Sequence, residues 1–262
     1  MAASPAPETF ESDPEWLKML TQGHRPVRLL RSVMKHLPTD PRCKVCSSPF
    51  AGVGGKVTGV FGFRPSRKNP NICGQCIDSM DPGGALLDIG VLFVDLRGST
   101  TLGEQMGAGQ FAQVLNRFYH LATDVLLSHD AIIDKLIGDE VMALFIPGIA
   151  GPDYRRKTCD AGLELIRAVH RDSTTREGLA FGVGVHSGPA FVGNVGGAVV
   201  DFTALGDTVN TAARLQALAQ PGELVISEEL CRSVSGPSLE GDCRTVDLRG
   251  KSEPFALRVV RP

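Results

Sequence analysis

The sequence predicts an α+β fold, in which strands and helices alternate along the C-terminal part of the chain. Residues 87–93, which are apolar apart from Asp88, are typical of a buried strand, and residues 108–129 carry apolar side chains at helical spacing. Two further stretches rich in apolar residues, 132–137 and 141–146, flank Gly138-Asp139. Two strands around a Gly-Asp pair are typical of a β-hairpin.

Two more helices and five short strands complete the predicted pattern: the helices 153–171 and 206–219 and the strands 179–185, 190–192, 223–226, 244–248 and 255–260. The strands 179–185 and 190–192 are expected to pair around a turn at Ser187-Gly-Pro189, because Gly-Pro is turn chemistry. The order of elements predicts a ferredoxin-like βαββαβ sheet with helices on one face.

The first 84 residues differ from the rest of the chain in the elements that they predict. Asp13-Pro14-Glu15 is typical of a helix start, with Asp as the cap and Pro at the first helical position. A second helix is expected over 26–37, and 81–84 is expected to be a turn-rich linker. We therefore divide the chain into residues 1–84, helices and a small cysteine module with an expected regulatory role, and a main domain of residues 85–262.

Charge and composition exclude several classes of protein. The net charge is −2, which argues against a general nucleic-acid binder, and no apolar run reaches the ~18 residues of a transmembrane helix. The N-terminus lacks the features of a secretory signal, so the seven cysteines indicate a reducing cytoplasm. Residues 25–68 carry ten Lys and Arg against one acidic residue. A solvated basic face explains them, and contact with nucleic acid, anionic lipid or a regulatory partner is the alternative.

Four of the cysteines form two pairs with metal-ligand spacing. Cys43-x-x-Cys46 and Cys73-x-x-Cys76 each present two thiolates from one tight turn, which is typical of a tetrahedral zinc site. An iron–sulfur or redox site is the main alternative, since four thiolates also suit iron.

Two aspartates follow apolar runs. Asp95 precedes Gly98-Ser99-Thr100, whose backbone N–H groups at a helix start could bind phosphate, and Asp139 lies at the hairpin turn. Brought together, the two carboxylates would make a divalent-metal site of the kind that handles nucleoside triphosphates. Each aspartate also has a structural interpretation, Asp95 as a helix cap and Asp139 as a turn residue.

Three basic or amide side chains accompany these aspartates. Lys135 lies four residues before Asp139, and alternation along a strand puts both on one face, so we expect them in one cleft. Asn210 and Arg214 are four residues apart on one helix face, where they suit ribose and a phosphate. An exposed polar helix face is the alternative.

Three segments now resemble the signature of class III nucleotidyl cyclases, over about residues 86–261: Phe93-Val-Asp-Leu-Arg-Gly-Ser-Thr, Lys135-Leu-Ile-Gly-Asp and Gly206-Asp-Thr-Val-Asn-Thr-Ala-Ala-Arg. The resemblance implies that Asp95 and Asp139 hold two Mg²⁺ or Mn²⁺ ions, assisted by the carbonyl of Leu96. It implies that Lys135 and Thr203 recognise the purine and that Asn210 orients the ribose. It further implies that Arg214 stabilises the transition state and that Lys251 binds the terminal phosphates. In this family the site forms between two chains, which implies a homodimer.

The resemblance favours ATP as substrate and cyclic AMP as product. The ammonium group of Lys135 donates, and N1 of adenine accepts, whereas N1 of guanine carries a proton. Thr203 stands where well-studied adenylyl cyclases have Asp, a departure that resembles a bacterial subgroup associated with bicarbonate responsiveness and that leaves GTP open. The alternatives are a guanylate cyclase, a palm-type diguanylate cyclase, and a non-catalytic nucleotide-sensing module.

Overall fold

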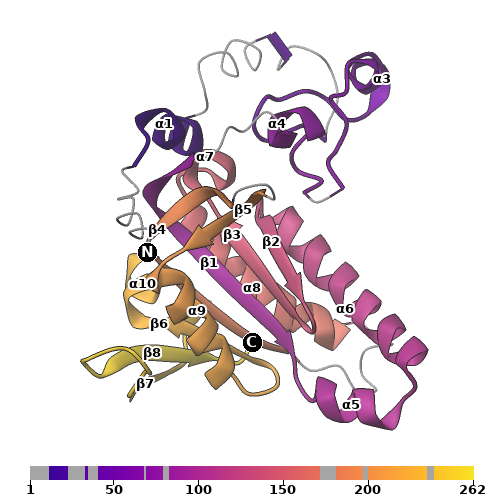
Figure 1. Ribbon diagram of the computed structural model, residues 1–262. Helices are drawn as coiled ribbons and strands as arrows, with labels where there is room; N and C mark the ends of the chain where they lie inside the picture. The colour runs from indigo at the N-terminus through magenta and orange to yellow at the C-terminus, as the bar shows by residue number, and fades with distance from the viewer. Residues whose placement is uncertain are drawn as a thin grey trace, which may run out of the picture.

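The computed structural model describes residues 12–22, 33–34, 41–67, 69–78, 83–171, 181–196, 200–234 and 239–262. Its strands are β1 (Gly83–Leu96), β2 (Ile132–Ile137), β3 (Glu140–Phe145), β4 (Phe181–Gly196), β5 (Val200–Leu205), β6 (Glu223–Ser227), β7 (Asp242–Val246) and β8 (Phe255–Val260). They form one sheet of order β2-β3-β1-β4-β6-β8-β7, with β5 paired to the end of β4 (Figure 1).

The described helices are α1 (Pro14–Gln22), α3 (Gly52–Val60), α4 (Gly74–Asp78), α5 (Ser99–Gln105), α6 (Ala108–Ser128), α7 (Pro147–Ala150), α8 (Tyr154–Arg171), α9 (Asp207–Leu218) and α10 (Glu228–Ser233). The predicted helices 108–129, 153–171 and 206–219 are confirmed as α6, α8 and α9, and the predicted hairpin is β2–β3. The α+β class with a cysteine module is likewise confirmed.

Helices cover both faces of the sheet, so the expectation of helices on one face is wrong. Leu92 and Val94 of β1 share a core with α6 and α8, while Val91 and Phe93 face the other way and share a second core with α1, α9 and the cysteine module. The reason is visible in β1 itself: residues 89–94 are buried without interruption, and a strand that is apolar on both sides needs cover on both sides.

The predicted turn at Ser187-Gly-Pro189 is also wrong, because β4 runs through it as one continuous strand. Its register with β1 extends from Gly83↔Asn194 to Leu96↔Phe181. On its other side β4 pairs with β6 up to Val185 and with β5 from Phe191. Pro189 lies in the stretch between those partners, where a residue without an N–H is tolerated.

The N-terminal part packs against the second core. The cap at Asp13 is confirmed: its carboxylate accepts a hydrogen bond from the N–H of Glu15 at 2.8 Å, and Trp16 and Leu20 of α1 are buried. The expected helix over 26–37 lies outside the described residues, apart from positions 33–34. Residues 83–84 of the expected linker belong to β1 instead. The domain division at residues 84 and 85 stays a prediction.

Among the helices in the described ranges, none is both long and apolar enough to cross a membrane.

Candidate active site

The first predicted group of site residues meets where β1 ends against the β2–β3 turn. Asp95 is in register with Glu140 of β3, and the N–H of Leu96 donates to the carbonyl of Asp139 at 3.0 Å. The chain reverses at Gly138, whose φ of 61° lies in the left-handed region that favours glycine. The two predicted metal-binding carboxylates therefore stand beside each other, as the sequence led us to expect.

Three carboxylates, Asp95, Asp139 and Glu140, share this corner, and the charge of Asp139 acts on the pKa values of the other two. Burial, and then the charge of Asp139, raises the pKa of Asp95 above its usual range, although Arg97 opposes the shift. Burial and the charges of Asp95 and Asp139 likewise raise the pKa of Glu140. Partly buried carboxylates that repel one another favour a cation in their midst.

Arg97 holds this corner together within the chain. Its Nη1 donates to Asp95 Oδ2 at 3.1 Å, and its Nη2 donates to the carbonyl of Gln216 on α9. The guanidinium lies over Gly182, where an added Cβ would come within 2.3 Å of Arg97 Nε, so a larger residue there would displace the guanidinium. The nearest cation to Asp95 is thus a neighbour on the same strand end.

The predicted phosphate-binding segment begins a short helix. Gly98, with a φ of 75°, is the N-cap of α5, and Ser99 and Thr100 are its first two residues. The hydroxyl of Ser99 donates to a carboxylate oxygen of Asp139. This bond joins the start of α5 to the hairpin turn, so the helix start and both aspartates form one unit.

The second group joins β2 to β5. Asp134, whose side chain is fully buried, accepts a hydrogen bond from the hydroxyl of Thr203 at 2.8 Å and lies 3.4 Å from Lys135 Nζ. Lys135 also donates to Asp201. Burial lowers the pKa of Lys135, but the carboxylates of Asp201 and Asp134 outweigh it and hold that pKa above its usual range. The ammonium group therefore stays charged beside Thr203.

Lys135 and Asp139 bind different partners, and our expectation that both line one cleft stays a prediction. Register shifts between Ile133 and Lys135, so that Asp134 forms a bulge in β2. From Lys135 to Ile137 the register with β3 is regular again, so the bulge lies before the stretch on which the expectation rested. Lys135 contacts Asp134 and Asp201, and Asp139 contacts Ser99.

The third group lies on α9 and the loop before β8. Asn210 is exposed, and Arg214 follows one turn later with its Nη1 buried and without a hydrogen-bond partner in the described part of the chain. Arg214 packs on Gly250, where an added Cβ would lie 3.1 Å from Nη2. The next residue, Lys251, donates to Asp207 at the start of α9. Three predicted substrate-binding groups are thus neighbours.

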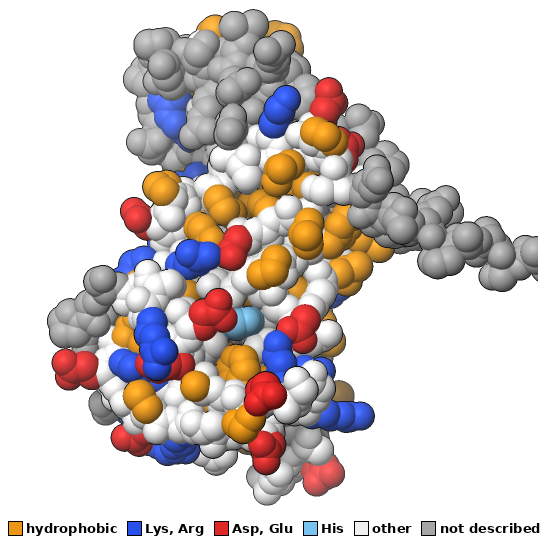
Figure 2. Space-filling view, turned by 90° about the vertical axis from the view of Figure 1, so that its left-hand side faces the viewer, with side chains coloured by type: hydrophobic (Ala, Val, Ile, Leu, Met, Phe, Trp, Pro, Cys, Tyr) orange, Lys and Arg blue, Asp and Glu red, His pale blue; other side chains and the backbone are white. Residues whose placement is uncertain are grey.

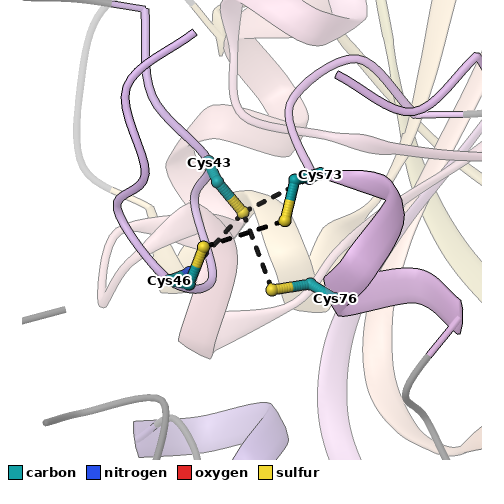
Figure 3. A group of neighbouring side chains, drawn as sticks. All are labelled: Cys43, Cys46, Cys73 and Cys76. Carbon is teal, nitrogen blue, oxygen red and sulfur yellow. Dashed lines mark hydrogen bonds between the residues drawn. The ribbon is translucent and has the colours of Figure 1, made fainter. Parts of the chain in front are cut away.

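The four predicted cysteine ligands converge. Cys43, Cys46, Cys73 and Cys76 are buried, and their sulfur atoms all lie within 4.8 Å of one another (Figure 3). The separation is 3.9 Å between Cys43 and Cys76 and 3.8 Å between Cys46 and Cys73. A tetrahedral ion with sulfur ligands at about 2.3 Å places the sulfurs about 3.8 Å apart, so the donor set fits one such ion.

The thiols cannot all ionise without a cation. A hydrogen bond from Cys43, and then one from Cys73, lowers the pKa of Cys46. The pKa values of Cys73 and Cys76 are raised, in each case first by the hydrogen bond with Cys43. A bound metal ion favours the thiolate form of every ligand, so it would allow all four cysteines to be ionised together.

Sequence reasoning missed the residues that connect these groups. Asp134 joins Lys135 to Thr203, Asp201 neutralises Lys135, and Arg97 neutralises Asp95. One signal was available: Asp134 follows two isoleucines in a strand, and a charged residue inside an apolar run needs a partner. Asp201 gave no comparable signal, because its partner is distant in sequence.

Carboxylates lie together at the end of the central strand β1, beside the start of α5, and a separate cluster of cations lies on α9 and the loop before β8. This arrangement is typical of proteins that bind nucleoside phosphates. Residues 85–258 match the model of the adenylate and guanylate cyclase catalytic domain, so the chain belongs to this family. The predicted membership of the class III cyclases is confirmed, and the chain carries a nucleotide-binding lyase domain of signalling type.

Curated relatives are longer than this chain. An uncharacterised protein of Mycobacterium tuberculosis is 33% identical over 185 residues, which cover 67% of this chain and 31% of that protein. An adenylate cyclase of Anabaena cylindrica is 29% identical over 211 residues, which cover 76% of this chain and 42% of that enzyme. The chain therefore spans about a third of the first relative and less than half of the second.

Solved structures of both specificities are similar. The guanylyl cyclase Cya2 superposes with a TM-score of 0.63 at 26% identity, over 68% of this chain and 93% of that one. The adenylyl cyclase CyaB from P. aeruginosa superposes with a TM-score of 0.59 at 28% identity, over 68% and 95%. Family membership alone does not distinguish ATP from GTP.

Proposed function

We propose that the protein is an adenylate cyclase, which converts ATP to 3′,5′-cyclic AMP and pyrophosphate. One observation carries the choice of ATP: the hydroxyl of Thr203 donates to Asp134, and the same carboxylate lies beside the ammonium group of Lys135. That both side chains lie beside one carboxylate supports the proposal that they recognise one purine.

The hydrogen-bond directions favour adenine. Because the hydroxyl proton of Thr203 is engaged by Asp134, its oxygen is left as an acceptor for the 6-amino group of adenine. Lys135 is a donor for adenine N1. Guanine presents an acceptor, O6, to the threonine and a protonated N1 to the lysine, so both contacts would be mismatched.

The corner at the end of β1 suits divalent metal ions. Asp95, Asp139 and the carbonyl of Leu96 offer hard oxygen ligands, and together they would hold two Mg²⁺ or Mn²⁺ ions. Such ions lower the pKa of the attacking 3′-hydroxyl and neutralise the leaving pyrophosphate. The backbone N–H groups at Gly98, Ser99 and Thr100 would bind phosphate beside them.

The cationic group would complete the reaction. Asn210 would orient the ribose, Arg214 would stabilise the charge that develops on the transferring phosphate, and Lys251 would bind the terminal phosphates. The buried, unpartnered Nη1 of Arg214 supports this role, because it is a donor without an acceptor in the described part of the chain.

We propose that the catalytic unit is a homodimer with two equivalent sites. Within one chain, Asn210, Arg214 and Lys251 form one cluster and the aspartates form another, and a two-fold axis would bring the opposite clusters of two chains together. Exposed apolar side chains occur on strands of the candidate site, among them Leu86 at 58% and Leu205 at 48%. Figure 2 shows apolar side chains gathered on one face, and a second chain would cover such a surface.

We propose zinc for the four-cysteine centre. Sulfur separations near 3.8 Å correspond to one tetrahedral ion, whereas a cluster of several irons needs its thiolates spread over a larger polyhedron. The cytoplasmic location predicted from the cysteines stays a prediction.

The experiment is direct. The purified protein is incubated with ATP or GTP in the presence of Mn²⁺ or Mg²⁺, and the products are separated by chromatography. Cyclic AMP that disappears in Asp95→Ala supports the proposal. Nucleotide binding without pyrophosphate release would instead assign a non-catalytic sensing module.

Guanylate cyclase activity is the second candidate, because the similarity to the guanylyl cyclase Cya2 is as strong as that to the adenylyl cyclase CyaB. Cyclic GMP as the main product would select it.

A further inference from the structure

The cysteine module is bound to the outer strand of the sheet through one buried side chain. Asn69, only 5% exposed, accepts a hydrogen bond from the N–H of Ile133 at 2.7 Å and donates one to the carbonyl of Ile133 at 3.1 Å. Since β2 lies at the end of the strand order, no further strand of the described residues pairs with its outward backbone groups. The amide of Asn69 supplies both missing partners.

Ile133 is directly followed by the groups that are proposed to recognise the base. Asp134 forms the bulge, binds the hydroxyl of Thr203 at 2.8 Å, and lies 3.4 Å from Lys135 Nζ. A bulge has no regular ladder to fix its conformation, so the bonds next to it decide where Asp134 points. Asn69 makes two such bonds.

The other end of the connection reaches the four thiols. The N–H of Ile72 donates to the carbonyl of Asn69 at 2.9 Å, and the N–H of Cys73 donates to Cys43 Sγ at 3.3 Å. The N–H of Lys44 donates to the carbonyl of Asn71 at 2.9 Å, which ties the loop to the first cysteine pair. The conformation of residues 69–73 therefore depends on the geometry of the cysteine centre.

We propose that Asn69 is a positioning residue that couples occupancy of the four-cysteine centre to recognition of the purine by Lys135 and Thr203. With an ion held by the four thiols, residues 69–73 would be fixed, and the amide of Asn69 would then fix the β2 bulge. This inference rests on the proposed function of the nucleotide site. It gives the module a role in substrate affinity and selectivity in addition to fold stability.

A matched pair of variants tests the role in the reaction. In Asn69→Ala the four thiols are untouched, so metal content by elemental analysis stays at one ion per chain. The KM for ATP rises about tenfold, kcat changes less than about twofold, and the preference for ATP over GTP falls. In Asn69→Asp the acceptor for the Ile133 N–H remains and the donor is lost, so the KM is intermediate.

Asn71→Ala is the control. Its side chain donates to the carbonyl of Leu127 at 2.8 Å, so it ties the same loop to α6 instead of to the bulge. We expect its KM to remain within about twofold of the parent protein. An unchanged KM in Asn69→Ala, or equal shifts in Asn69→Ala and Asn71→Ala, would overturn the proposal.

Hydrogen exchange of the full chain supplies a measurement that is independent of catalysis. In the absence of nucleotide and Mg²⁺, removal of the cysteine-bound metal with a chelator should raise exchange across residues 132–137 at least fivefold in the parent protein. In Asn69→Ala exchange should already be high, and chelation should add little. If chelation leaves β2 unchanged in the parent protein, the coupling is absent. If β2 responds but neither nucleotide is cyclised, the proposed function fails while the coupling stands.

Discussion

The corner at the end of β1 carries carboxylates, whereas the group around α9 carries the cations Arg214 and Lys251, and one charge in each region is paired with a neighbour in its own chain. Asp95 at the corner is paired with Arg97, whereas Lys251 beside α9 is paired with Asp207. Arg97 also reaches the carbonyl of Gln216 on α9, but neither ion pair joins a carboxylate of the corner to Lys251. We call these two regions, the carboxylate corner and the cationic group around α9, the two half-sites. In each half-site a side chain of the same chain pairs with the charge, and the metal ions and the triphosphate would have to displace that side chain.

The two regions also differ in how they tolerate their charge. Burial raises the pKa of Asp95, so its ionised form is disfavoured until a cation arrives. On the other side Arg214 keeps a buried Nη1 without an acceptor in the described part of the chain. A nucleotide bound between two chains would relieve both, since its metal ions meet the carboxylates and its phosphates meet the guanidinium.

Complementation between two inactive variants tests whether the two half-sites of one active site come from two chains. It is the prediction with the largest expected effect. Asp95→Ala and Arg214→Ala should each lower kcat by about 10³-fold or more, because one loses metal binding and the other a transition-state donor. When the two variant chains are unfolded and refolded together, half of the dimers are mixed, and each mixed dimer has one intact site. Activity should therefore recover to roughly a quarter of the parent level, measured as cyclic AMP formed.

The control is Asp124→Ala, which removes an exposed carboxylate from α6 and should leave activity within about twofold. Absence of recovery in the mixture, together with normal dimerisation by sedimentation, would mean that each site is built within one chain. The comparison of two half-sites would then describe a single site in an open conformation.

Lys135→Glu tests the base-recognising group, with a smaller expected effect. The substitution places a third carboxylate beside Asp134 and Asp201, and it removes the donor to adenine N1. We expect kcat/KM for ATP to fall about 100-fold and the ratio of GTP to ATP turnover to rise, with both nucleotides assayed in parallel. A fall of equal size for both nucleotides would show that Lys135 serves the fold and does not select the base.

The sequence predicted those parts of the fold that depend on local pattern. The hairpin β2–β3 and the helices α6, α8 and α9 follow from apolar spacing and turn residues, and all are confirmed. The continuous strand β4 was not predictable in this way, because Gly188-Pro189 is turn chemistry unless the neighbouring strands leave one edge free. Tertiary context overrode the local signal.

The candidate site divides in the same manner. The convergence of Asp95 with Asp139, and that of the four cysteines, follow from residue type and spacing, and both are present. The bulge at Asp134, which shifts the register of β2 just before Lys135, was not predicted, and no single-sequence pattern reveals it. The buried connection through Asn69 depends on a loop 64 residues away in sequence.

Asp95→Asn tests whether the ionised carboxylate of Asp95 lowers the stability of the fold, and this is the smallest effect that we expect. Burial and the charge of Asp139 raise the pKa of Asp95 in the folded chain above its unfolded value. The stability that the protonated carboxyl contributes is therefore complete below the usual aspartate range, and it is lost as the pH rises through the raised pKa. At neutral pH without divalent metal, Asp95→Asn should raise the Tm by about 2 °C, because an uncharged amide replaces a disfavoured charge and can still accept from Arg97.

The sign should reverse when metal is added. Mn²⁺ binds the folded parent protein and raises its Tm, whereas Asp95→Asn has lost a ligand and should respond little. Asp124→Asn removes the same charge from an exposed position and should change the Tm by less than about 1 °C in either buffer. A metal-free Tm that falls in Asp95→Asn would show that Arg97 outweighs burial and repulsion. The corner would then be a stable ion pair that metal must break, and the two half-sites would be alike in this respect, since Lys251 is already held by Asp207.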